Sequence, residues 1–370
     1  MYVFLLKGRK AEFNVAQNMN YCFSNDVVPL FEIINELYNP KYKLDPKTGD
    51  YLLVLKENAK KRSKVKLNPL DEDVNTLEKI SGYLNGKIAF IDYFRFSTDK
   101  YGNRISLSKV LLARKLSADA SKYYEKLITI ANYENLIPVL SVKKSFTLKM
   151  HELEEIINQL QLRSKKIAIR VEYAYFEEMF ETIRGLLRSE DFVLFDIGNL
   201  SIKSCKIELE FFKDAEILAK KIVLNSPRRK EIKNGLYENQ EITKYIDNSV
   251  ASRFKEFDFE GYGDYGGLKD VLPEDVVNSG KGAALSLLYS YNKNAFYSFS
   301  NSDTKLGVSG YKSVVDGILS MKVDLDPIGD CPAMQKIVQM KDSGKFGIWS
   351  TWNEITLTRY LHQLYANWGK

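Results

Sequence analysis

Charged side chains stand at the ends of apolar segments throughout the first 267 residues of the chain. Burying a charge without a partner costs several kcal/mol, so these groups must either pair with one another or face a wet cavity. Carboxylates in such a setting could bind a divalent metal ion or act as a general acid and base, and cations could hold a phosphate or a carboxylate. The carboxylates are Glu32, Asp92, Asp196 and Asp264, and the cations are Lys7, Arg9, Arg170 and Arg228.

Two interpretations of these charges stay open at this point. They could line a functional mouth, or they could form a ring of ion pairs that neutralises itself and does no chemistry. On the first interpretation the predicted catalytic residues are Glu32, Asp196, Asp264 and His362. The predicted substrate-binding residues are Lys7, Arg9, Asp92, Arg170, Arg228 and Tyr265.

His362 is the one candidate that lies outside the predicted barrel, residues 1–267. It lies three residues after Arg359 in RYLHQL, so both should share one face of a helix. It could reach the mouth as an acid or base, although a packing histidine on a helix surface is the more frequent outcome.

The elements that must position these residues alternate between short apolar strands and amphipathic helices. A (β/α)8 barrel has this order, and its functional residues lie at the carboxyl ends of the strands. A doubly wound open sheet is the alternative, but no GxGxxG follows the first strand. The predicted strands cover residues 2–6, 27–34, 87–96, 136–142, 166–172, 192–197, 221–226 and a last segment that starts at Phe257.

The eighth strand is predicted in FDFEGYGDYGG, residues 257–267. Phe257 and Phe259 alternate with acidic residues, and the glycines that follow permit sharp turns or close approach. Because the eighth strand of a barrel neighbours the first, Asp264 should lie near Lys7 and Arg9. There it could do chemistry or only neutralise Lys7.

The barrel is predicted to occupy residues 1–267, interrupted by a hairpin insertion at residues 41–67 with its turn at residues 47–50. A basic run in this insertion begins at Lys56 and ends at Lys66. It could contact a phosphate backbone or be the solvated flank of a loop. Residues 268–370 form an aromatic-rich α+β extension with a hairpin at residues 285–299 and three helices, expected to pack on the barrel.

Composition excludes several classes of protein. The 370 residues carry a net charge of +6, which permits contact with phosphates without demanding it. Three widely spaced cysteines without a CxxC pair argue against a zinc site and favour reduced thiols in the cytoplasm. No segment resembles a signal peptide or a membrane span, and no GxSxG nucleophile elbow occurs. SGKG at residues 279–282 lacks the spacing of a phosphate loop.

Five motifs resemble the Beta-protein family, named for a protein of T-even phages and also found in bacteria. They are YVFLLKGRKAEF, VVPLFEII, FVLFDIG, GYGDYGG and GIWSTWNEITLTRYLHQL, which follow one another along most of the chain. The resemblance implies a barrel-like fold and a role in phage–host conflict, but no established reaction. The insertion at residues 41–67 departs from the compact pattern of the family. The resemblance marks Lys7, Arg9, Glu12, Glu32, Asp196, Asp264, Tyr265 and His362.

Two functions from different classes fit these observations. The first is an enzyme that performs hydrolysis or transfer on a phosphorylated or nucleotide-like substrate, with Mg²⁺ as a candidate cofactor. The second is a non-catalytic module that binds nucleic acid or a partner protein through the basic run and the aromatic extension. Neither function calls for a membrane.

Overall fold

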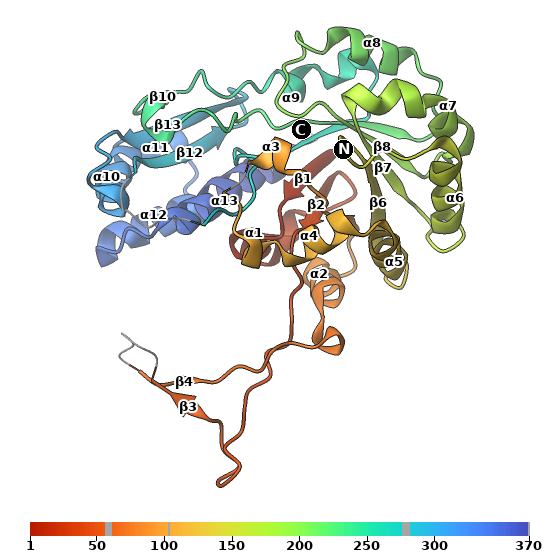
Figure 1. The fold of residues 1–370 in the computed structure, drawn as a ribbon. Helices are drawn as coiled ribbons and strands as arrows, with labels where there is room; N and C mark the ends of the chain where they lie inside the picture. The colour runs from red at the N-terminus through yellow and green to blue at the C-terminus, as the bar shows by residue number, and fades with distance from the viewer. Residues whose placement is uncertain (56–60, 103, 276–281, 369–370) are drawn as a thin grey trace.

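The computed structural model describes residues 1–55, 61–102, 104–275 and 282–368, and its main feature is a closed barrel of eight parallel strands (Figure 1). Neighbouring strands pair in the order β1-β11-β9-β8-β7-β6-β5-β2, and β2 pairs again with β1. The predicted (β/α)8 fold is therefore confirmed. The barrel strands are β1 (Tyr2–Leu6), β2 (Val27–Ile33), β5 (Ala89–Tyr93), β6 (Leu136–Val142), β7 (Ala168–Glu172), β8 (Phe192–Asp196), β9 (Lys220–Leu224) and β11 (Gly261–Asp264).

The strands are nearly continuous apolar runs because both of their faces are covered. All seven residues of β2 are buried, for example. The helices between the strands turn one apolar stripe toward the barrel, as Leu153, Ile157 and Leu160 do on α6 (Met150–Gln161). The other helices of this layer are α1 (Lys10–Asn18), α2 (Thr76–Leu84), α3 (Thr98–Tyr101), α4 (Leu111–Ala118), α5 (Ala120–Ile130), α7 (Phe176–Leu186), α8 (Lys206–Asp214) and α9 (Ser249–Arg253).

The eighth strand begins later than the sequence pattern predicts. Residues 254–257 form a 3-10 helix, and the strand is the glycine-rich segment Gly261–Asp264 itself. A Cβ atom on Gly263 would lie 2.6 Å from the carbonyl oxygen of Val3, so glycine is what allows β11 to pair closely with β1. The helix predicted at residues 241–254 is also shorter, because β10 (Glu241–Ile242) takes its beginning and α9 its end.

The helix that should follow the eighth strand comes from the far end of the chain. Helix α13 (Trp349–Asn367) packs against α1 and against β12 (Ala284–Ser290). Its Leu357, Leu361 and Leu364 belong to the same buried core as the barrel strands. The extension at residues 268–370 therefore completes the helical layer of the barrel, and the two parts of the chain share one core.

The rest of the extension forms a second, smaller layer. Strand β12 pairs with β13 (Ala295–Asn301) in the hairpin that the sequence predicts, and β10 adds a third strand. Helices α10 (Tyr311–Ser320), α11 (Lys322–Leu325) and α12 (Pro332–Ser343) accompany it (Figure 1). Trp352 is buried in the core between this sheet and the helices, so it packs rather than offering a stacking surface.

The insertion after β2 is an arm that projects away from the barrel (Figure 1). The predicted turn at residues 47–50 is flanked by a bridge between Leu44 and Tyr51. The two-stranded ladder lies farther along, between β3 (Leu53–Val54) and β4 (Ser63–Lys64). Residues 56–60 of the basic run and 279–281 of SGKG lie outside the described residues. None of the helices in the described ranges combines the length and apolar character that crossing a membrane requires.

Candidate functional site

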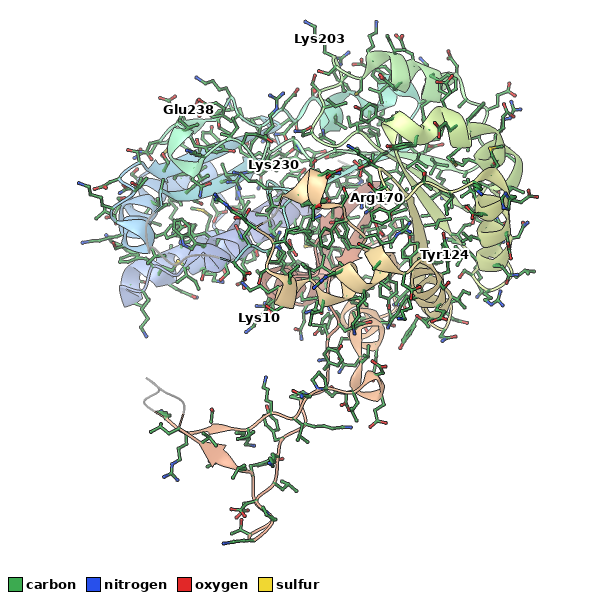
Figure 2. The ribbon with its side chains drawn as sticks, viewed as in Figure 1. Lys10, Tyr124, Arg170, Lys203, Lys230 and Glu238 are labelled. Atoms are coloured by element: carbon green, nitrogen blue, oxygen red, sulfur yellow. The ribbon has the colours of Figure 1, made fainter. Side chains whose placement is uncertain are left out.

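An arginine at the centre of the barrel joins three of the predicted site carboxylates (Figure 2). Arg170 lies near the end of β7, and its Nη1 donates to Glu32 Oε1 at 2.7 Å and to Asp92 Oδ2 at 3.0 Å. Its Nε and Nη2 donate to Asp196 Oδ2 at 2.9 and 2.7 Å. These residues converge as the sequence predicts, but they do so as a set of mutual ion pairs.

A second cation, Lys7, extends this network toward β11. Its Nζ lies 2.7 Å from Glu32 Oε2 and 2.5 Å from Asp270 Oδ1. The hydroxyl of Tyr265 donates to Glu32 Oε1 at 2.9 Å. Lys7 and Glu32 are completely buried, so their charges depend on these partners and not on water.

The charges of the network hold one another ionised. Burial would raise the pKa of Glu32, but Lys7 and Arg170 outweigh burial and lower it. In the same way Arg170 and Lys100 outweigh the effect of burial on Asp196 and lower its pKa. A carboxylate held ionised in this way is a poor proton donor at neutral pH, so Glu32 and Asp196 suit structural charge balance better than general acid catalysis.

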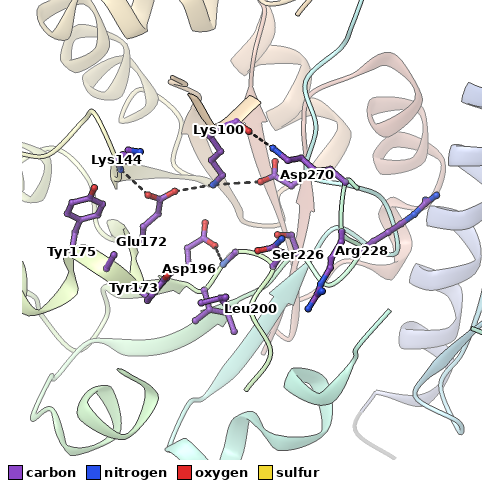
Figure 3. A pocket seen from close by; sticks show the side chains of 16 residues that line it. Lys100, Lys144, Glu172, Tyr173, Tyr175, Asp196, Leu200, Ser226, Arg228 and Asp270 are labelled. Atoms are coloured by element: carbon purple, nitrogen blue, oxygen red, sulfur yellow. Dashed lines mark hydrogen bonds and ion pairs between the residues drawn. The ribbon is translucent and has the colours of Figure 1, made fainter. Parts of the chain in front are cut away.

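A cavity of about 370 Å³ lies at the carboxyl ends of β7, β8 and β9 (Figure 3). Every lining residue ends or follows a barrel strand, which is where barrel enzymes carry their sites. Lys100 Nζ donates to Glu172 Oε1 at 3.0 Å, and the backbone N–H of Lys144 donates to Glu172 Oε2 at 2.9 Å. We call this cavity the mouth pocket; it is lined by Lys100, Lys144, Glu172, Tyr173, Ala174, Tyr175, Asp196, Ile197, Gly198, Asn199, Leu200, Ser226, Arg228, Arg229, Lys230 and Asp270.

The mouth pocket has more positive than negative charge available. Its carboxylates are already paired: Glu172 with Lys100, and the other two with the buried network beneath. Among the described residues, four cations on its wall form no ion pair with a carboxylate. These four are Lys144, Arg228, Arg229 and Lys230. The pocket is therefore suited to an anion.

Asp264 does not lie in the mouth, which corrects the sequence prediction. Its carboxylate accepts hydrogen bonds from Tyr2 OH at 3.0 Å and from Tyr360 OH at 2.7 Å, beneath helix α13. Burial raises its pKa, against the effect of these hydrogen bonds. Side chains alternate along a strand, so Tyr265 points inward to Glu32 while Asp264 points outward to the helix layer. Asp270, not Asp264, neutralises Lys7.

Two other predicted residues serve elsewhere. Arg9 Nη2 pairs with Glu12 Oε1 at 2.5 Å at the beginning of α1 and does not line the mouth pocket. His362 is buried, and its Nε2 lies 3.3 Å from Oδ1 of the exposed Asp330 in the extension. Both residues are therefore removed from the predicted catalytic and substrate-binding set.

Arg228 does line the mouth pocket, as predicted for a substrate-binding residue. Its guanidinium donates to Tyr237 OH at 3.2 Å, to the Gly267 carbonyl at 3.1 Å and to Asn234 Oδ1 at 3.1 Å. Burial lowers its pKa. It is the one predicted cation of the mouth whose charge no carboxylate compensates.

The sequence analysis missed several residues of the site. Lys144 and Asp270 stand in loops after barrel strands and Lys100 stands in the short helix α3, where a chain rich in lysine and aspartate gives no local signal. Glu172 ends β7 and could have been chosen by the same rule that selected Asp196. The loop after the eighth strand was assigned to the extension, which hid Asp270.

The described residues contain no group of three or more His, Cys, Asp or Glu side chains placed to hold a metal ion. Glu32, Asp92 and Asp196 converge on the guanidinium of Arg170, which occupies the position that a cation would need. These residues therefore do not fit Mg²⁺, and no step is assigned to a metal.

Comparisons with known proteins assign no family to this chain. No protein-family model matches the chain, and no curated protein matches it. A solved structure from Bacteroides thetaiotaomicron, described as a "putative alpha-L-fucosidase", aligns with 71% of this chain and 86% of its own at 9% identity and a TM-score of 0.39. Membership of the Beta-protein family therefore stays a prediction, and the closed barrel is the assignment that stands.

Proposed function

We propose that the protein is an enzyme that binds a small phosphorylated or nucleotide-like molecule in the mouth pocket. The observation that carries this proposal is the set of unpaired cations on the pocket wall: Lys144, Arg228, Arg229 and Lys230. A pocket of about 370 Å³ matches the lower end of small-molecule sites, which measure roughly 300–1,000 Å³. Loops after the seventh and eighth strands commonly hold phosphate in barrel enzymes, and β9 is the seventh strand here.

The remaining lining residues suit the rest of such a ligand. Tyr173 and Tyr175 are half-buried and offer apolar ring surface beside the cations. Glu172 is the carboxylate of the pocket that lies outside the Arg170 network, and its side chain is 18% exposed. We assign it the role of general acid or base for hydrolysis or transfer, with Lys100 as its orienting partner.

Calorimetric titration with orthophosphate, pyrophosphate and a panel of nucleotides and sugar phosphates tests the proposal. We expect binding to weaken at least tenfold when Arg229 and Lys230 are both replaced by serine, and to weaken as salt is added. Exposed Lys203, which does not line the pocket, provides the control Lys203→Ser (Figure 2). The proposal would be overturned if the folded protein bound none of these anions, or if Lys203→Ser weakened binding as much as the double variant does.

A second candidate, nucleic-acid binding by the arm, is favoured by one feature. Lys64 Nζ lies 3.5 Å from the ring centroid of exposed Tyr51 and 5.3 Å from that of Tyr42, so cations and stacking surfaces occur together. Salt-dependent RNA or DNA binding that drops when Lys61 and Arg62 become alanine would support this function. Binding that is unchanged in this variant would remove it.

A further inference from the structure

Lys143 differs from the other lysines of the barrel mouth. It directly follows β6 and is half-buried. Its Nζ lies 4.1 Å from the ring centroid of Phe94, a ring that also has Lys7 Nζ at 4.2 Å. Lys7 and Lys100 each have carboxylate partners, whereas in the described ranges Lys143 Nζ forms neither a hydrogen bond nor an ion pair. Its ammonium form therefore lacks the stabilisation that the neighbouring lysines receive.

The surroundings of Lys143 connect it to the site. Ser141, two residues earlier on β6, points inward and donates to Asp92 Oδ2 at 2.8 Å. Alternation along the strand directs Lys143 to the same side. The other oxygen of that carboxylate, Asp92 Oδ1, is buried and has no hydrogen-bond partner. The next residue, Lys144, lines the mouth pocket, and so does Lys100, whose charge acts on Lys143.

Burial lowers the pKa of Lys143 to about 8; Asp92 and Glu32 oppose this effect, and Arg170 and Lys100 add to it. At pH 7 about one such amine in ten is neutral, compared with fewer than about one in a thousand for an ordinary lysine. A desolvated lysine beside another cation is a known form of activated amine nucleophile.

We propose that Lys143 forms an imine with the carbonyl carbon of a small substrate whose phosphate or carboxylate group lies in the mouth pocket. The neutral amine attacks the carbonyl carbon and forms a carbon–nitrogen bond. The carbonyl oxygen then leaves as water with the two hydrogens of the amine, so no oxidant or reductant is needed. The binding of the anionic group rests on the function proposed above, whereas the reactivity of the amine does not.

Reductive trapping tests this inference. The full-length protein is mixed with one equivalent of pyridoxal 5′-phosphate, which carries an aldehyde and a phosphate, and is reduced with borohydride. Peptide mass spectrometry then locates the secondary amine. We expect most of the adduct on Lys143 in the wild type and in the exposed control Lys203→Gln, and at least a tenfold loss at this peptide in Lys143→Met and Lys143→Arg. Labelling of the wild type should be half-maximal near pH 8.

The outcomes separate the imine from the anion pocket. An adduct spread over surface lysines, equal in wild type and Lys143→Arg, overturns the inference. A second outcome is reversible binding of pyridoxal phosphate that weakens in the Arg229 and Lys230 double variant but leaves no adduct on Lys143. This outcome overturns the imine and supports the anion pocket. An adduct on Lys143 that excess orthophosphate does not suppress retains the reactive lysine and refutes the anion pocket. Circular dichroism confirms that each variant is folded, and Lys143→Arg keeps the positive charge if Lys143→Met does not fold.

Discussion

Replacing Arg170 with methionine is expected to destabilise the protein more than any other single substitution in the barrel mouth. The guanidinium makes four hydrogen bonds to Glu32, Asp92 and Asp196. The first two of these carboxylates are completely buried and the third is 7% exposed. Methionine fills a similar volume but leaves three carboxylates facing one another without a cation between them.

The size of the effect follows from burial. Removing one partner of a buried ion pair costs about 3–5 kcal/mol, because the remaining charge stays buried and uncompensated. Lys7 still compensates part of the Glu32 charge, so we expect a loss in this range and not a multiple of it. Urea unfolding at pH 7, followed by tryptophan fluorescence and circular dichroism, measures the free energy of unfolding directly.

The pH dependence gives a second measure of the same effect. In the wild type the folded-state pKa values of Glu32 and Asp196 are lowered, so their contribution to stability is present above pH about 4 and is lost as the pH falls. Without Arg170, burial raises both pKa values, and protonation relieves the strain. The difference between Arg170→Met and wild type should therefore be largest at pH 7 and shrink as the pH falls toward about 4.

A surface arginine provides the control for this measurement. Arg253 pairs with Glu256 at 2.8 Å on the exposed side of α9, and Arg253→Met should leave the unfolding curve unchanged. If Arg170→Met lowers the free energy of unfolding no more than this control does, or if the loss does not depend on pH, the buried network does not stabilise the barrel mouth.

Two further predictions concern the seam between β1 and β11. Gly263→Ala should lower the free energy of unfolding in urea by about 1–3 kcal/mol, because its Cβ would meet Val3 atoms at 2.6 and 2.8 Å. Gly82→Ala on α2 is the control: nothing lies within 4 Å of its Cβ, so this substitution should raise the free energy of unfolding by about 1 kcal/mol. Equal effects would refute the packing argument. Tyr360→Phe should lower the free energy of unfolding by about 1–3 kcal/mol near neutral pH, because it removes a hydrogen-bond donor from buried Asp264. The loss should be smaller at a pH where Asp264 is protonated. A loss that does not depend on pH would contradict this reasoning.

The fold could be predicted from the sequence because the barrel's requirements are local. A strand covered on both faces needs an apolar run, and a helix lying on it needs one apolar stripe; both patterns are visible in short windows such as VVPLFEI. The eighth strand was predicted to begin at Phe257, earlier than its observed start at Gly261, because its own residues are glycines and aromatics that allow close approach to β1. The missing eighth helix could not be found locally, because α13 reaches the barrel from the other end of the chain.

The site was predicted less well, for a different physical reason. Convergence at the strand ends follows from the fold, so Lys7, Glu32, Asp92, Arg170 and Asp196 were found. Which way a side chain points depends on the register of its strand, and an error of one position exchanges the inside and outside of the barrel. Both Asp264 and Tyr265 were assigned to the mouth, but only Tyr265 points inward, because neighbouring residues of a strand face opposite sides. The loop residues of the mouth pocket are set by tertiary packing and have no periodicity to reveal them.

The structure separates the charges that hold the barrel from the charges that can act. Arg170 and Lys7 satisfy the buried carboxylates, so these groups have little capacity left to bind a ligand or move a proton. Among the described residues, the groups without a carboxylate partner are four cations of the mouth pocket and the amine of Lys143. Because free energy is gained where a ligand pairs an unpaired charge, the proposed function rests on these groups, and the charged residues most prominent in the sequence form the support beneath them.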